Sequence, residues 1–178
     1  PIIDMKNKVI EHKDSSPLKV SNGEIKFINV KFKYKSEERE ILNSISLTIK
    51  GGEMTSLVGH SGAGKTTILN LIPRFYDPIS GDIKIDNQSI YKSTINSLRK
   101  NISLVSQDVI LFDNTIKENI SYANPSATQD DIVRACEFAA ADEFISNMPN
   151  KYDTLIGENG IRLSGGQKQR ISIARAVL

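Results

Sequence analysis

A loop that can bind phosphate constrains this chain more than any other feature. Residues 59–66 read Gly-His-Ser-Gly-Ala-Gly-Lys-Thr and fit the pattern G-x-x-x-x-G-K-[ST] at each fixed position. An apolar run at 54–58 precedes the loop, and an amphipathic helical pattern follows it from Thr67. The order strand, loop, helix is what a nucleoside triphosphate site requires, so the sequence predicts such a site here.

Each residue type in the loop has its own expected role. Glycines allow backbone N–H groups to turn toward phosphate oxygens, and the helix N-terminus adds a favourable dipole. Lys65 is expected to reach the β- and γ-phosphates, and the Thr66 hydroxyl to ligate Mg²⁺. The candidate nucleotide-binding residues are Gly59, His60, Ser61, Gly62, Ala63, Gly64, Lys65, Thr66 and Thr67.

Composition places the chain among ordinary globular proteins. Its 178 residues suit one domain, and 39% hydrophobic with 25% charged residues is typical of soluble folds. Lysines and arginines are scattered among acids at a net charge of +2, which argues against a nucleic-acid-binding face. The single cysteine, Cys136, excludes an internal disulfide and lies in a helical apolar pattern, so we expect it in the core. No apolar stretch reaches membrane-spanning length.

The local patterns predict an alternation of strands and helices. Residues 1–22 are polar and turn-rich and are expected to be a linker. Thr115 with Glu118, and Thr128 with Asp131, have the spacing of capping pairs at helix N-termini. The predicted strands are 24–34, 45–49, 54–58, 82–85 and 102–105, and the predicted helices include 94–99 and one from 128 to about 141.

A second candidate phosphate site lies about a hundred residues after the first, at 163–167 (Leu-Ser-Gly-Gly-Gln). Ser164 and Gln167 have the spacing of a capping box that begins the last helix. That explanation leaves out Gly165 and Gly166, because a glycine in a helix costs roughly 0.5–1 kcal/mol relative to alanine. Glycines there indicate that a ligand approaches the backbone closely at a helix N-terminus.

The two motifs together resemble the nucleotide-binding domain of an ATP-binding cassette (ABC) transporter of the exporter type, over residues 24–178. The resemblance implies an α/β P-loop NTPase fold with an antiparallel β subdomain, a mixed core sheet that is incomplete at the C-terminus, and a helical subdomain at about 108–163. It implies a domain at 23–178 and, in 1–22, a linker from a preceding membrane-spanning region. The implied cofactors are ATP and Mg²⁺.

The same resemblance implies a head-to-tail homodimer with two bound nucleotides. Each ATP would lie between Lys65 of one chain and the signature residues of the other, which are Ser164, Gly165, Gly166 and Gln167. Tyr34 corresponds to the aromatic residue that stacks on adenine, a contact worth about 1–3 kcal/mol. Gln107 corresponds to a glutamine that approaches Mg²⁺ and the attacking water, and it is the candidate catalytic residue.

Coupling to a membrane partner is implied by a further segment. Residues 156–160 resemble the exporter segment that touches the transmembrane domain, and Glu158 is the candidate contact. The resemblance to lipid and multidrug exporters implies export of a hydrophobic or amphipathic substrate. It places the domain on the cytoplasmic face of the inner or plasma membrane.

Parts of the family's pattern lie outside these 178 residues. The chain begins without Met and stops within an apolar helical pattern, so we expect a fragment of a longer protein. The strand that ends in Asp-Glu (Walker B) and the switch histidine are not among its residues, so negligible ATP hydrolysis is expected. Two alternatives stay open: a nucleotide-gated dimerisation module without turnover, and a soluble ATPase of DNA repair or chromosome maintenance.

Overall fold

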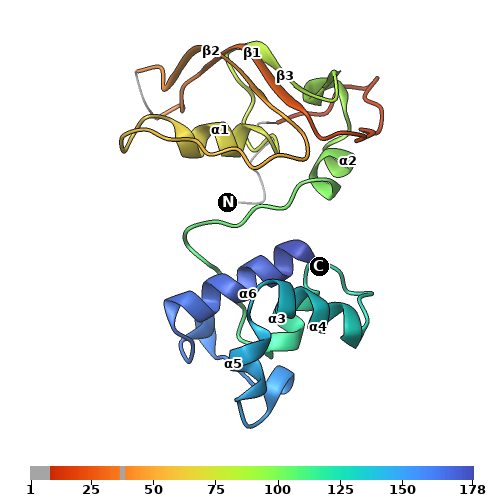
Figure 1. The fold of residues 1–178 in the computed structure, drawn as a ribbon. Helices are drawn as coiled ribbons and strands as arrows, with labels where there is room; N and C mark the ends of the chain where they lie inside the picture. Colours follow the sequence, from red (N-terminus) through yellow and green to blue (C-terminus); the bar gives the residue numbers. More distant parts are fainter. Residues whose placement is uncertain (1–8, 37–38) are drawn as a thin grey trace, which may run out of the picture. The chain divides into compact units, whose positions relative to one another are not determined.

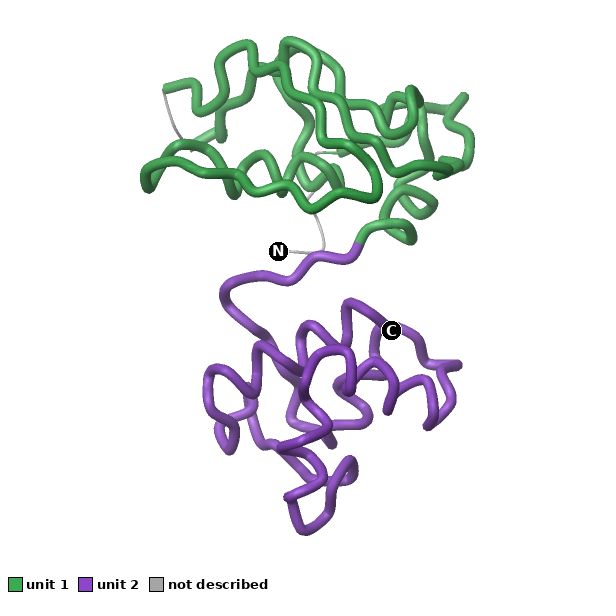
Figure 2. Tube along the Cα trace, in the orientation of Figure 1, with its two compact units in different colours: residues 1–102 green, residues 103–178 purple. Residues whose placement is uncertain are grey.

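The computed structural model describes residues 9–36 and 39–178 and divides the chain into two compact units. Unit 1 comprises residues 1–102 and unit 2 residues 103–178 (Figure 2). Each unit has its own cluster of buried hydrophobic side chains.

Unit 1 is built on a four-stranded antiparallel sheet with the order β2-β1-β3-β4 (Figure 1). The strands are β1 (Ile25–Phe32), β2 (Leu42–Ile49), β3 (Ser80–Ile85) and β4 (Gln88–Ser89). Phe27 of β1 is paired with Leu47 on one side and Ile83 on the other. The apolar residues of β1 meet neighbours on both edges, which explains why this strand lies inside the sheet.

The helical elements in the described part of unit 1 are α1 (Lys65–Leu71), the 3₁₀ helix η2 (Ile90–Lys92) and α2 (Ile95–Lys100). Helix α1 packs against the sheet through Ile68 and Leu71, which share a buried cluster with Phe27 and Val30. The predicted helix at 94–99 is confirmed as α2, with the Thr94 side chain as its N-cap.

The first described residues also belong to the structure of unit 1. The Leu18 side chain is buried, and its backbone N–H donates to the Ser97 hydroxyl at 2.8 Å. The Asp86 carboxylate accepts backbone N–H bonds from Ser21, Asn22, Gly23 and Glu24. These bonds, that from Ser21 foremost, hold the pKa of Asp86 well below its usual range. The boundary of the expected linker at residue 22 stays a prediction, and residues 1–8 lie outside the described part.

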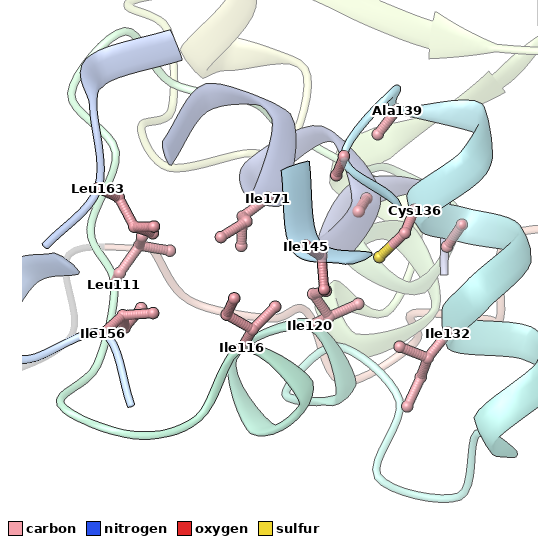
Figure 3. Close-up of a cluster of buried hydrophobic side chains, with 13 residues drawn as sticks. Leu111, Ile116, Ile120, Ile132, Cys136, Ala139, Ile145, Ile156, Leu163 and Ile171 are labelled. Atoms are coloured by element: carbon pink, nitrogen blue, oxygen red, sulfur yellow. The ribbon is translucent and has the colours of Figure 1, made fainter. Parts of the chain in front are cut away.

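Unit 2 is helical. Its elements are α3 (Ile116–Ser121), α4 (Gln129–Phe138), α5 (Asp142–Ser146), the 3₁₀ helices η3 (Lys151–Asp153) and η4 (Glu158–Gly160), and α6 (Gly165–Val177). Ile171 of α6 lies in the core with Ile116 and Ile120 of α3 and Ile145 of α5 (Figure 3). Cys136 is buried in the same core, as expected, and burial raises the pKa of its thiol to about 11.

The predicted capping pairs are confirmed. Thr115 with Glu118 begins α3, and Thr128 with Asp131 begins α4, each as a complete capping box. Helix α4 ends at Phe138, three residues earlier than expected, because Ala140 adopts a left-handed φ of 52°. The Ala141 N–H then bonds to the Cys136 carbonyl at 2.8 Å and the Ala140 N–H to that of Glu137, which is a Schellman ending. The sequence did not predict this helix end, because the left-handed position holds alanine instead of the usual glycine.

Two predicted strands are absent from the described residues. Segments 54–58 and 102–105 are extended or irregular and pair with no strand in residues 9–36 and 39–178. Met54 is 98% and Val58 93% exposed. An apolar run gains ladder hydrogen bonds and burial only beside partner strands, and no described strand supplies them here. The described sheet is accordingly antiparallel rather than mixed.

Candidate functional site

The phosphate loop leads directly into α1 in unit 1. Gly64 is the N-cap of α1 with φ 86°, and its carbonyl accepts the first helical bond from Ile68 N–H at 2.9 Å. A Cβ at Gly64 would lie 2.8 Å from Leu42 Cδ2, at the start of β2. Both the left-handed backbone and this close approach require glycine, so β2 fixes where α1 can begin.

The loop also has the geometry of a phosphate cradle. Gly62 has φ 79° with open space where a Cβ would stand, and residues 59–63 are exposed. The Lys65 ammonium donates to the carbonyls of Gly59 at 2.8 Å and His60 at 2.7 Å, which holds it across the loop. Backbone and cation thus fit a triphosphate, and the neighbouring exposed Thr66 offers the hydroxyl that Mg²⁺ would need.

Tyr34 is brought to the same helix by the fold. It follows β1 directly, and its hydroxyl lies 3.3 Å from the hydroxyl of Thr67, the third residue of α1. Thr67 is buried, whereas Tyr34 is half-buried. The two residues are 33 apart in the sequence, so no local pattern could show this contact. The contact places Tyr34 beside the helix that follows the phosphate loop, and its stacking on adenine stays a prediction.

The second motif begins α6 in unit 2. The Ser164 hydroxyl accepts from Gln167 N–H at 3.3 Å, and the Gln167 side chain accepts from Ser164 N–H at 2.9 Å. The capping box is therefore real. A Cβ at Gly165 or Gly166 would meet no atom within 4 Å, and both glycines are exposed. Packing within the described chain does not require glycine at either position, and the approach of a ligand to them stays a prediction.

The remaining predicted residues also lie in unit 2. Gln107 is exposed in an irregular segment, beside a turn in which the Ser106 hydroxyl donates to the Asp108 carbonyl at 2.6 Å. Glu158 is exposed at the start of η4. The nearby Gly160 is buried with φ 65°, and a Cβ there would lie 2.9 Å from Leu111 Cδ1, so packing explains that glycine.

The structure thus brings Tyr34 and residues 59–67 together in unit 1, and holds Gln107, Glu158 and 164–167 in unit 2. How Gln107 approaches Thr66, and how 164–167 meet a nucleotide, stay predictions. The only Asp-Glu pair in the sequence, Asp142–Glu143, begins α5 rather than ending a strand. Asp142 accepts from the Tyr152 hydroxyl at 2.5 Å, so this pair is not the acidic strand end of the resemblance.

Sequence reasoning missed one residue beside the site, Tyr76. Its ring centroid lies 5.1 Å from that of Tyr34. The signal available in the sequence was the aromatic pair Phe75–Tyr76, placed just after the helix that follows the loop.

The family is settled by comparison with known proteins. A family model described as ABC transporter matches residues 42–178, which is most of the chain. The chain belongs to the ABC transporter family. Its phosphate loop, α1 and the motif at α6 all lie within the matched range, and the fold is that of an ABC ATPase domain with a P-loop NTPase architecture.

Among the relatives of this ABC domain are exporters by name. ABC transporter B family member 4 of Dictyostelium discoideum is 52% identical over 162 residues, covering 90% of this chain and 21% of the relative. A Staphylococcus aureus protein named as a multidrug export ATP-binding/permease protein is 49% identical over 175 residues, covering 98% and 30%. A solved bacterial Atm1-family ABC exporter with ATP bound matches with a TM-score of 0.95 at 42% identity, covering 99% and 31%.

This ABC domain therefore spans between a fifth and a third of the length of those relatives. In residues 9–36 and 39–178, no helix is both long enough and apolar enough to cross a membrane. The longest helix between the two motifs, α4, has ten residues, so the described chain holds no long coiled coil of the kind expected for a chromosome-maintenance ATPase.

Proposed function

We propose that this chain is the ATP-binding domain of an exporter that couples ATP binding and hydrolysis to export of a hydrophobic or amphipathic substrate. The observation that carries the proposal is the geometry of residues 59–67, with the Lys65 ammonium held across a loop of exposed backbone. The multidrug exporter and the ATP-bound Atm1-family exporter among its relatives support it.

In this proposal unit 1 binds the nucleotide. The backbone N–H groups of 59–64 and the Lys65 ammonium surround the β- and γ-phosphates, and the Thr66 hydroxyl contacts Mg²⁺. Mg²⁺ keeps most of its ligands from phosphate and water, which suits a site with few protein oxygens. Tyr34 stacks on the adenine base. Gln107 is the proposed catalytic residue, which would approach Mg²⁺ and the attacking water.

The signature at α6 completes the site of a second copy. Two open glycines at the start of a helix leave backbone N–H groups accessible to a γ-phosphate, and Ser164 and Gln167 hold that helix end in shape. A head-to-tail homodimer, closed only with ATP, is the arrangement that uses both phosphate-binding motifs for one nucleotide.

The membrane side of the proposal concerns partners outside the chain. A transmembrane domain, in the same or an associated polypeptide, would receive the conformational change at the exposed segment that contains Glu158. The domain would then lie at the cytoplasmic face of a membrane. No nucleic acid is required.

The experiment that tests this proposal is calorimetric titration of Mg-ATP into the chain and into Lys65→Ala. We expect saturable binding that Lys65→Ala abolishes, because the variant removes the cation that faces the phosphates. Lys50→Ala is the matched control, since Lys50 is a largely exposed lysine of the same unit and its removal should leave the affinity unchanged. Equal binding by wild type and Lys65→Ala would overturn the proposed site.

A further inference from the structure

Three aromatic rings gather beside the phosphate loop in unit 1. The ring of Tyr34 lies 4.8 Å from that of Phe32 at an interplanar angle of 89°, and 5.1 Å from that of Tyr76 at 86°. Phe32 and Tyr76 contact each other at 5.7 Å with tilted rings. Both neighbours of Tyr34 stand in the edge-to-face arrangement that aromatic pairs favour, and neither lies flat against it.

Tyr34 is thereby held at both of its ends. Its hydroxyl meets the buried Thr67 hydroxyl of α1 at 3.3 Å, while its ring meets Phe32 and Tyr76. Phe32 is 3% exposed and belongs to the core of the sheet. The hydrogen bond joins the ring directly to the helix that carries Lys65.

Tyr76 differs from Phe32 because it is not a core residue. It is 41% exposed. Its turn is nevertheless firmly held: Arg74 donates to the Asp77 carboxylate at 2.7 Å across it, and Arg99 donates to the carbonyls of Pro73 and Arg74, both at 3.0 Å. Arg74 is only 1% exposed, so this turn is anchored in the interior.

We propose that Tyr76 is a positioning residue for the nucleotide base, which fixes the Tyr34 ring through an edge-to-face contact while the Tyr34–Thr67 hydrogen bond ties that ring to the phosphate loop. The inference rests on the proposed ATP site and adds a residue to it. A ring held in place before binding loses less conformational entropy when a base stacks on it. Tyr76 therefore affects the affinity for ligands that carry a base.

The test compares two ligands that share the triphosphate. Mg-ATP and Mg-tripolyphosphate are titrated into wild type, Tyr76→Leu and Tyr76→Phe. An aromatic pair contributes only a modest free energy beyond the surface area that it buries. We therefore expect Tyr76→Leu to weaken ATP binding about fivefold and to leave the affinity for tripolyphosphate unchanged. Tyr76→Phe keeps the ring and should bind ATP like wild type. Equal weakening of both ligands, or no weakening of ATP, would overturn the assignment.

The outcome for Lys65→Ala separates this inference from the proposed function. If Lys65→Ala binds neither ligand but Tyr76→Leu binds ATP as tightly as wild type, only the role of Tyr76 is contradicted. Retention of both ligands in Lys65→Ala sinks the proposed site itself, and the role of Tyr76 with it.

A second measurement does not depend on nucleotide. The chain has no tryptophan, so Tyr34→Trp introduces a single fluorescent reporter at the ring in question. Adding Tyr76→Leu should lower the fluorescence anisotropy of Trp and raise its quenching by acrylamide, whereas adding Tyr76→Phe should change neither. Circular dichroism melting of the same variants identifies any that are unfolded. If Tyr76→Leu is unfolded, Tyr76→Phe is compared instead with Phe32→Leu, a control that removes a ring from the core. An anisotropy that Tyr76→Leu leaves unchanged in a folded chain would contradict the proposal.

Discussion

At the scale of single residues, two glycines of this chain occupy very different surroundings. Gly64 is required by the fold, because its φ is 86° and a Cβ would lie 2.8 Å from Leu42 Cδ2. Gly166 lies in a regular helix with open space around it. The first glycine shapes the phosphate loop, whereas no packing contact in the described chain requires the second.

These different surroundings predict opposite effects of alanine on stability. Gly64→Ala should lower the free energy of unfolding by roughly 2–4 kcal/mol, from left-handed strain plus overpacking. Gly166→Ala should raise it by about 0.5–1 kcal/mol, because alanine is the better helix former. Urea unfolding of both variants beside wild type measures the difference. A Gly64→Ala chain as stable as wild type would show that the loop can relax away from β2.

At the scale of elements, side-chain caps determine where three of the helices of unit 2 begin. Helices α3, α4 and α6 each start at a complete capping box. In α4 the Asp131 carboxylate accepts from the Thr128 hydroxyl at 2.6 Å and from its backbone N–H at 2.9 Å, and it also pairs with Arg134. These contacts, the Thr128 hydroxyl first, lower the pKa of Asp131 to about 2.

The lowered pKa of Asp131 predicts an acid-dependent contribution of this cap. A carboxylate whose folded pKa lies below its unfolded value of about 3.9 stabilises the fold above that pH. The contribution is lost as the pH falls from about 4 toward about 2. Asp131→Asn should therefore be less stable than wild type at pH 7, and the difference in urea unfolding should shrink as the pH falls through about 2. Asp130→Asn, in the same helical turn, is the matched control for the removal of one carboxylate from this turn.

At the scale of the whole molecule, each unit holds on its own core one of the two candidate halves of the proposed nucleotide site. Unit 1 presents the phosphate loop and Tyr34, and unit 2 presents the open glycines of α6. The family resemblance resolves the two halves by pairing copies head to tail. The described structure supports the geometry of each half, and their meeting is the proposed part.

ATP-dependent self-association tests that pairing directly. With Mg-ATP, the mass of the 178-residue chain by light scattering should double, and phosphate release should stay at background. The reason is that the one Asp-Glu pair begins α5, so these residues supply no acidic strand end to act as general base. Sustained phosphate release that Lys65→Ala abolishes would contradict the second expectation, and an unchanged mass would contradict the first.

The extent to which the sequence predicted this protein follows from the range of the interactions involved. The phosphate loop, the capping boxes and the motif at 163–167 are contiguous stretches, so their residues are close together whatever the tertiary structure. The strands β1, β2 and β3 were also found from their apolar pattern. The same reasoning failed at 54–58 and 102–105, because an apolar run becomes a strand only when partners are present.

What the sequence by itself determined is the chemistry: a triphosphate loop with Lys65 and Thr66, a second glycine motif, and membership of a family recognised by both. Only the tertiary structure decided that Tyr34 meets Thr67 across 33 residues and that Tyr76 stands against its ring. It also decided that Gly64 packs on Leu42 while Gly166 faces open space. Such contacts depend on how β1, β2 and α1 pack together, and packing between distant segments leaves no periodic signal in the chain.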